Sequence, residues 1–327
     1  MKGAWVALAG LGIVVACQLS LTVGALPTPV PVVLEALLSP DDSDAHAVVL
    51  QRVPRTLLGL LVGCALGACG ALIQGWTRNP LADPGLLGVN AGATLAVTVG
   101  AGLLGFREPG QYVWWAVAGA LGTTLLVLAV ARSGRDGGTP VRFVLTGVAM
   151  EAILLGISSF IILGNLQVFQ AVRFWGIGSL GGRDPAVVIA VLPFLLIGVV
   201  LAVVAATMLN ATALGDELGS SLGVHPGATR GLCVAAVTLL AGSAVALAGP
   251  IAFVGLMVPH IVRRVVGADQ RWLVLISFLV APTLVLAADV GGRVVLPSGE
   301  LPVGIGTAIM GGPVMVALAR RQRLGAL

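Results

Sequence analysis

Long apolar stretches separated by short polar breaks run through the whole chain. Read against proline, glycine and charged breaks, this pattern predicts ten apolar helices. They are expected near residues 3–25, 56–76, 86–105, 112–131, 141–164, 187–208, 231–249, 251–266, 273–290 and 302–319. Most approach the length of about 20 residues with which a helix crosses a bilayer core of about 30 Å. The predicted fold class is therefore all-α, a polytopic membrane protein with about ten transmembrane helices.

Two of these spans leave an alternative open. Only Gly249 and Pro250 separate the seventh span from the eighth, and Pro259 interrupts the eighth, so one long kinked element is the alternative. The first run ends near residues 23–25 in small residues that loosely fit a signal-peptidase site. We favour two separate spans and a retained first helix.

The composition fits a membrane protein better than a soluble one. Of 327 residues, 57% are hydrophobic and 10% are charged, and the mean hydropathy is +1.05. A soluble domain carries about 25% charged residues. The 46 glycines suit membrane helices whose backbones approach closely. The four cysteines lie inside apolar runs, where packing is a better interpretation than a disulfide framework or a metal site.

The distribution of basic residues predicts the orientation. With the N-terminus inside, 12 of the 18 basic residues fall on the cytoplasmic side, and the acidic residues Glu35, Asp41, Asp42 and Asp44 fall in the first outer loop. Ten spans then place both termini in the cytoplasm. A merged seventh and eighth span would instead send the basic C-terminal end outward, which is a second reason to keep them separate.

Two acidic residues lie within the predicted spans. A carboxylate there costs about 2.5–3.5 kcal/mol on insertion scales, so each needs a partner or a path to water. Asp289 has Arg293 four residues on and is expected to pair with it at the outer interface. Glu151 is interpreted either as a carboxylate bonded to a neighbouring helix, which we favour, or as the proton carrier of a secondary transporter. Such transporters show inverted repeats, and no convincing repeat is visible.

The longest inner loop, at about 211–229, predicts a short helix of low hydrophobicity. It is either a solvated connector or an element that inserts into a partner protein. On the outer side, Arg52, Arg55 and Arg293 stand at span ends, where they either snorkel to the interface or form a ring of exposed arginines that docks an acidic partner. Because Lys2 is the only lysine, no phosphate-binding GxxxxGK[ST] loop exists, so this chain is not expected to hydrolyse nucleotide.

Four long motifs resemble one known family. They are RVPRTLLGLLVGCALGACGALIQGWTRNPLADPGLLGVNAGA, LGDELGSSLGVHPGATR, GPIAFVGLMVPHIVRRVVG and GELPVGIGTAIMGGPVMVALARR, in this order from about Arg52 to Arg321. Together they are similar to the permease subunits of type II ATP-binding-cassette importers for ferric siderophores, haem and cobalamin. A non-transporting scaffold or receptor, the remaining alternative, does not explain four ordered motifs.

The resemblance implies a single permease domain over 1–327 in the bacterial inner membrane. It implies a pair of permeases, formed by two copies or with a sister chain, on a cytoplasmic ATPase dimer, and an extracytoplasmic binding protein that delivers cargo. Membrane lipid surrounds the pair, and no nucleic acid is involved. ATP and magnesium belong to the ATPase, so no cofactor is expected in this chain. Ferric siderophore is favoured as cargo over haem or cobalamin.

The resemblance also implies roles for individual residues. The binding protein is expected to dock on Arg52, Arg55 and Arg293. Coupling to the ATPase is expected from Asp216, Glu217, Leu218, Gly219, Leu222 and Gly223. The cytoplasmic gate is expected to contain Asn79, Pro80, Leu81 and Thr139. On this hypothesis the polar stretch TRNPLADPG is a non-helical turn at the inner mouth of the transport path, where irregular backbone is tolerated because water is present.

Overall fold

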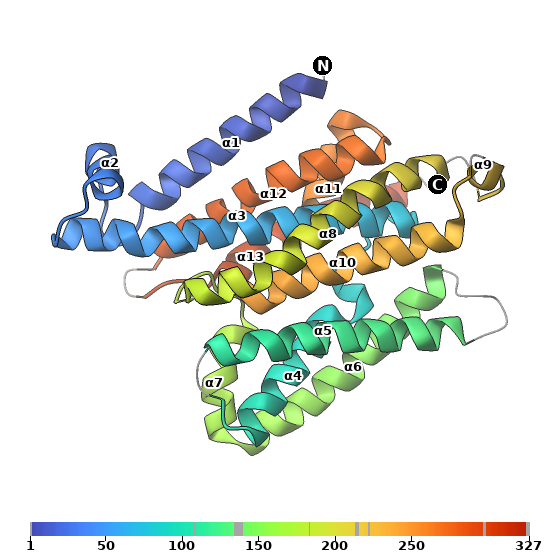
Figure 1. The fold of residues 1–327 in the computed structure, drawn as a ribbon, viewed down its shortest axis with the longest axis horizontal. Coiled ribbons are helices and arrows are strands. Elements are labelled where there is room, and N and C mark those ends of the chain that lie inside the picture. The colour runs from blue at the N-terminus through green and yellow to red at the C-terminus, as the bar shows by residue number, and fades with distance from the viewer. Residues whose placement is uncertain are drawn as a thin grey trace.

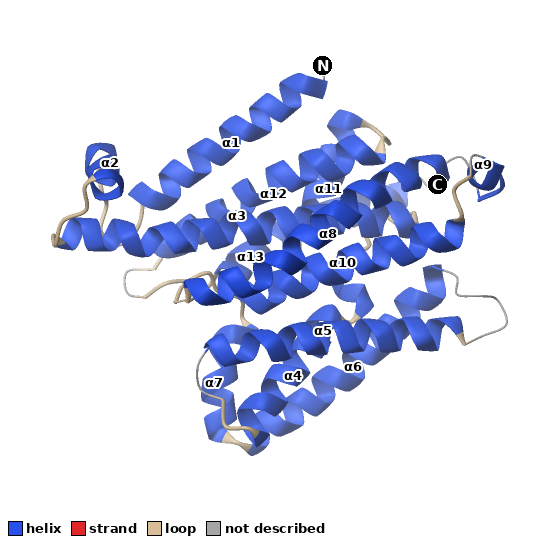
Figure 2. Cartoon of the chain, in the orientation of Figure 1, coloured by secondary structure: helices blue, strands red, loops and turns tan. Residues whose placement is uncertain are grey.

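The computed structural model describes residues 2–106, 109–133, 140–182, 184–212, 216–221, 223–296 and 299–324. Helices account for nearly all of these residues, and no strand occurs among them (Figure 2). The all-α fold class is confirmed.

Each of the ten predicted spans contains one helix. These are α1 (Lys2–Thr22), α3 (Asp44–Thr77), α4 (Val89–Leu103), α5 (Pro109–Arg132), α6 (Pro140–Gly164), α8 (Pro185–Thr212), α10 (Pro226–Ala248), α11 (Val254–Val266), α12 (Gln270–Val294) and α13 (Val303–Leu324). Seven of them are long and apolar enough to cross a membrane by length and composition, whereas α4, α11 and the apolar part of α13 are shorter.

Four short elements complete the described fold. They are α2 (Val30–Leu38), the 3₁₀ helix η1 (Pro84–Leu87), α7 (Leu166–Gly176) and α9 (Asp216–Ser221). The hydrophobic pattern predicted α9 but neither α2 nor α7, because both are shorter than a membrane span and interrupt no apolar run. The short helix expected in the inner loop at about 211–229 ends at Ser221, shortly before Gly223 takes a φ of 80°.

Backbone geometry separates the seventh and eighth spans. Gly249 has a φ of 77° and Phe253 a φ of 69°, so the chain turns between α10 and α11. The alternative of one long kinked element is therefore wrong. Another boundary also differs from expectation: α3 begins at Asp44, where Ser43 Oγ accepts a hydrogen bond from the His46 amide, rather than near residue 56.

The helices divide into a central group and a side group. Helix α3 packs against α12, α10 and α11, and α10 packs against α8. Helices α4, α5, α6 and α7 lie together beside this group (Figure 1). Helix α9 and the C-terminal end of α13 lie at the right of the view, and α2 and α7 lie at the left. We call these the α9 end and the α2 end of the bundle.

Glycines on α3 allow the central helices to touch. A Cβ atom at Gly70 would overlap the carbonyl oxygen of Gly255 on α11, and one at Gly67 would overlap the carbonyl oxygen of Ser277 on α12. Gly92 on α4 and Gly119 on α5 exclude a Cβ in the same way, each against the other's carbonyl oxygen. The glycine-rich composition thus serves backbone-to-backbone packing, as expected for membrane helices.

Candidate functional site

A network of charged side chains lies at the α2 end of the bundle. Asp289 on α12 is fully buried and accepts a two-pronged hydrogen bond from Arg55 on α3, with Nε to Oδ2 at 3.0 Å and Nη2 to Oδ1 at 2.8 Å. Arg293 donates to the same carboxylate through Nε at 3.0 Å. The expected pairing of Asp289 with Arg293 is confirmed, and Arg55 is an additional partner that spacing along the sequence could not reveal.

Two of the arginines also hold the C-terminal end of α1 and the turn that follows it. Arg293 Nη1 donates to the Ser20 carbonyl at 2.7 Å. Arg52 donates to the carbonyls of Leu21 at 2.9 Å and Leu26 at 2.7 Å, and to the Thr28 hydroxyl at 3.0 Å. These bonds join α1 to α3 and α12, so the first helix is an integral part of the network at the α2 end.

The predicted docking arginines therefore come together, but not as an exposed ring. All three line one cavity of about 550 Å³ at the α2 end. Arg52 and Arg293 are only 7% and 3% exposed, so the expectation that they are exposed is wrong. Arg55 is more accessible, and its Nη1 donates to Glu300 at 2.5 Å. Glu300 is half exposed and was not among the predicted site residues.

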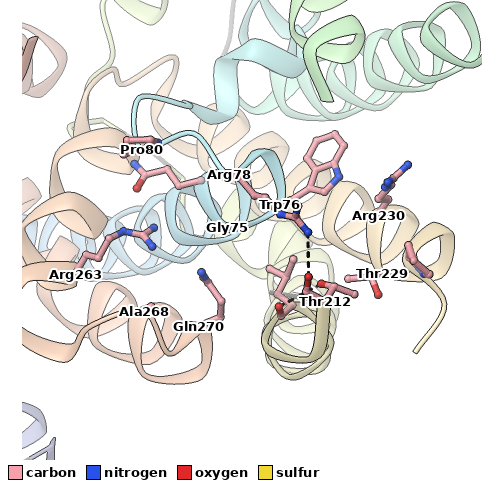
Figure 3. A pocket seen from close by; sticks show the side chains of 13 residues that line it. Gly75, Trp76, Arg78, Pro80, Thr212, Thr229, Arg230, Arg263, Ala268 and Gln270 are labelled. Carbon is pink, nitrogen blue, oxygen red and sulfur yellow. Dashed lines mark hydrogen bonds between the residues drawn. The ribbon is translucent and has the colours of Figure 1, made fainter. Parts of the chain in front are cut away.

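A second cavity, of about 490 Å³, opens at the α9 end of the bundle (Figure 3). Its walls come from five segments: Gln74, Gly75, Trp76, Arg78 and Pro80; Leu209 and Thr212; Pro226, Thr229 and Arg230; Arg263; and Ala268 with Gln270. Pro80 belongs to the predicted gate, while Thr212 and Pro226 stand on either side of α9. The structure thus brings the predicted gate and the base of the predicted coupling helix to one cavity.

The charged residues among the described lining of this cavity are the arginines Arg78, Arg230 and Arg263, and none is acidic. Arg78 Nη2 donates to the Thr212 carbonyl at 3.0 Å, which ties the end of α3 to the end of α8. By contrast, the buried Nε of Arg263 has no hydrogen-bond partner among the described residues. The side-chain oxygens of Gln74 and Gln270 are also buried without a partner there. A cavity with such walls suits water or a polar ligand.

The TRNPLADPG stretch owes its shape to local hydrogen bonds. Arg78 ends α3 in the left-handed region with a φ of 51°. The Asn79 side-chain oxygen accepts from the Leu81 amide at 3.0 Å, and the Asp83 carboxylate accepts from the Gly85 amide at 2.8 Å and caps η1. The predicted break in the helix is confirmed, although part of it winds into the short helix η1. Thr139, the remaining predicted gate residue, lies outside the described residues.

Helix α9 occupies the predicted coupling segment. Asp216, Glu217, Leu218 and Gly219 fall within it, Gly223 follows it, and Leu222 lies outside the described residues. Of this segment's residues, Gly219 is buried against the end of α8, beside Thr212. The helix is therefore attached to the frame that surrounds the cavity.

Glu151 lies near the gate stretch. A Cβ at Gly147, one turn earlier on α6, would overlap the Leu86 carbonyl oxygen of η1, so this part of α6 presses against the turn. No cluster of three or more His, Cys, Asp or Glu side chains that could hold a metal occurs in the described part of the chain.

Comparison with known proteins decides the family. The profile of the FecCD transport family matches residues 12–321. The chain belongs to the FecCD transport family. It is 45% identical over 314 residues to the ferric enterobactin transport system permease protein FepD of Escherichia coli (strain K12), covering 96% of this chain and 94% of the relative.

Other similar proteins are named for different cargoes. The chain is 34% identical over 333 residues to the cobalamin import system permease protein BtuC of Halobacterium salinarum, covering 95% and 88% of the two chains. A solved metal-chelate-type ABC transporter in an inward-facing conformation matches with a TM-score of 0.78 and 25% identity over 96% of this chain and 97% of the other. This FecCD protein is thus a multi-pass permease of type II ABC importers, the class that carries iron siderophores, haem or cobalamin, and it is not itself an enzyme.

Proposed function

We propose that the chain is the permease of an ATP-driven importer that moves a ferric siderophore into a bacterial cytoplasm across the inner membrane. The α2 end faces outward toward a binding protein, and the α9 end faces the cytoplasm, so both termini are cytoplasmic. ATP and magnesium are bound by a separate ATPase pair. The observation that carries the proposal is the cavity at the α9 end, because its wall joins the gate stretch to both sides of α9.

This arrangement supports a simple transmission of force. Thr212 lies at the C-terminal end of α8, directly before the α9 segment, and its carbonyl is held by Arg78 beside the gate turn. A displacement of α9 by an ATPase therefore reaches the gate through one hydrogen bond rather than through a long path. Ferric siderophore is preferred as cargo because the relative with 45% identity is named for ferric enterobactin.

Transport tests the proposal directly. Vesicles carrying this chain, its ATPase and its binding protein would be offered ferric siderophore, haem and cobalamin in turn, with ATP or with a proton gradient alone. Uptake of ferric siderophore that requires both ATP and the binding protein is expected. Uptake driven by the gradient without either partner would overturn the proposal and favour the alternative in which Glu151 carries a proton.

The gate assignment is tested at Asn79. Asn79→Ala removes the acceptor of the Leu81 amide, so the turn loses its local bond while the helices remain. Transport or leak is expected to change, with normal assembly with the ATPase. Thr77→Ala is the matched control, because this neighbouring hydroxyl donates to the Ile73 carbonyl within α3 itself. Wild-type uptake and leak in Asn79→Ala would refute the assignment.

Deletion of residues 216–223 tests coupling, because it removes α9 and the residues that follow it. The ATPase is expected to be lost from the purified complex. Co-purification at wild-type yield would show that the ATPase binds elsewhere.

Docking of the binding protein is proposed to involve Arg55, the most accessible of the three arginines. A carboxylate of the binding protein would take the place of Glu300 on Arg55 Nη1, while Asp289 keeps the other nitrogens. Glu300→Gln should then raise the affinity for the binding protein. Arg55→Lys should lower it, because an ammonium cannot make the forked contact and reach a second carboxylate at once. Unchanged affinity in both variants would leave these arginines with a structural role only.

A further inference from the structure

A narrow apolar groove lies on the outside of the bundle between α8 and α12. Its volume is about 300 Å³. The floor is made of Ala68 on α3 with Ala202 and Ala206 on α8, each no more than 2% exposed. Valine, leucine and phenylalanine side chains form the walls, and Arg271 is the one charged residue among the described residues that line the groove.

The surface around the groove is apolar as well. Val203 and Leu275, which line the groove, are 59% and 44% exposed. Val200, next to the groove on α8, is 61% exposed. In a chain whose α8 crosses the membrane, such side chains meet hydrocarbon, so the groove opens toward the acyl chains of lipids.

Arg271 stands at the α9 end of this groove, in the first turn of α12. Its side chain is exposed and has no hydrogen bond or ion pair among the described residues. The acidic residue two positions earlier, Asp269, is already occupied: Lys2 Nζ lies 3.1 Å from it and Asn210 Nδ2 donates at 2.8 Å. Only the backbone amide of Arg271 donates to Asp269, at 3.1 Å. The guanidinium is therefore left for an anion from outside the chain.

Thr207 is the other polar residue among the described residues that line the groove, and its hydroxyl is already hydrogen-bonded. Thr207 donates its hydroxyl to the Val204 carbonyl at 2.7 Å, within its own helix. An occupant must therefore combine a long apolar part with an anionic group at the α9 end. Guanidinium groups bind phosphate oxygens through paired, charge-assisted hydrogen bonds, and basic residues beside grooves between membrane helices bind anionic head groups on the cytoplasmic side.

We propose that this groove binds an anionic phospholipid, with one acyl chain over the alanine floor and the phosphate on Arg271. The site has a mechanical consequence. Asn210 near the end of α8 also accepts from the Gln270 amide at 2.7 Å, so α8 and α12 meet just beyond the groove. A bound lipid braces the same two helices immediately before α9.

The experiment measures retained lipid. The permease, purified in mild detergent with its partners, would be analysed by mass spectrometry for phosphatidylglycerol and cardiolipin relative to phosphatidylethanolamine. Arg271→Gln should lower this ratio about fivefold, the factor that corresponds to about 1 kcal/mol for one basic residue near anionic lipid. Val203→Trp, at an exposed rim, should block the groove and reduce all tightly retained lipid without disturbing the buried floor.

Two matched variants serve as controls. Arg132→Gln removes an exposed arginine from the last turn of α5, and Val200→Trp adds the same bulk on α8 outside the groove. Both should retain lipid as the wild type does. An unchanged lipid ratio in Arg271→Gln would overturn the proposal. So would a loss of permease pairing in Val203→Trp with unchanged lipid, because the groove would then be a contact between chains. Monodisperse elution and unchanged melting temperature establish that each variant is folded.

Discussion

The arginines at the two ends of the bundle differ in how completely their nitrogen atoms are hydrogen-bonded. At the α2 end, Arg55 and Arg293 converge on the fully buried Asp289, and Arg52 is bonded to backbone carbonyls. At the α9 end, Arg78 and Arg263 surround a cavity, and the buried Nε of Arg263 has no partner among the described residues. A network of paired charges holds its geometry, because each separation exposes an uncompensated charge. The Nε of Arg263 has no such restraint from the described residues, and it lies at the end that holds the TRNPLADPG turn and α9.

The largest effect is expected at Asp289. Asp289→Asn keeps the shape but leaves Arg55 and Arg293 without their shared counter-ion. Loss of one partner from a buried pair costs about 3–5 kcal/mol. A clear fall in the melting temperature of the purified protein is expected. Glu300→Gln, at a half-exposed partner of Arg55, is the control and should cost no more than about 1 kcal/mol. Equal effects in the two variants would mean that the network is not the source of rigidity.

A smaller loss is expected at Arg52. Arg52→Lys keeps the charge, but an ammonium cannot span the carbonyls of Leu21 and Leu26 and the Thr28 hydroxyl as the guanidinium does. Loss of charge-assisted bonds should destabilise the protein by about 1.5–3 kcal/mol. Thermal unfolding measures it. A lysine variant as stable as the wild type would contradict the assignment of Arg52 to holding the turn after α1.

At the α9 end, substitution of two arginines that line the same cavity should change the stability of the protein differently. Arg78→Gln loses the bond to the Thr212 carbonyl and should cost about 1–2 kcal/mol. Arg263→Gln removes a guanidinium whose buried Nε has no partner in the part of the chain that the structure describes, so stability should be unchanged or higher. Both would be measured by denaturation in the same detergent. A strong destabilisation by Arg263→Gln would show that this end is as tightly paired as the other.

The smallest effect concerns the N-terminus. The hydrogen bond from Asn210, helped by Lys2, holds the pKa of the Asp269 carboxyl below its usual value. This stabilisation is fully present above the unfolded-state pKa of about 3.9 and is lost as the pH falls through the lower folded-state pKa. Because the pair is partly exposed, no more than about 1 kcal/mol is involved. Lys2→Ala should therefore reduce stability slightly at neutral pH and less at pH values below that range. An equal difference at both pH values would argue against the ion pair.

Much of the architecture could be predicted from local pattern. Apolar runs of membrane length and their proline and glycine breaks located all ten span helices. The break at TRNPLADPG was visible because Asn79 favours a turn and Pro80 and Pro84 have no amide hydrogen with which to continue a helix. The pairing of Asp289 with Arg293 followed from four-residue spacing on one helix. Helices α2 and α7 were missed, since the search was for apolar runs of membrane length and both helices are shorter than that.

Contacts between segments that are far apart in the chain could not be predicted from the sequence. Arg55 and Asp289 are 234 positions apart, and Arg78 and Thr212 are 134 apart, so no local period joins them. The burial of Arg52 and Arg293 depends on the carbonyls that α1 and its following turn present to them.

By itself, the sequence determined the number and approximate limits of the membrane helices, the close approach that glycine permits, and the family. Only the tertiary structure decided which charges neutralise one another and which buried nitrogen, that of Arg263, has no partner among the described residues. Helix formation and membrane insertion depend on neighbours within about one turn or one span. The state of a charge depends on whatever the packed fold brings within a few ångströms of it.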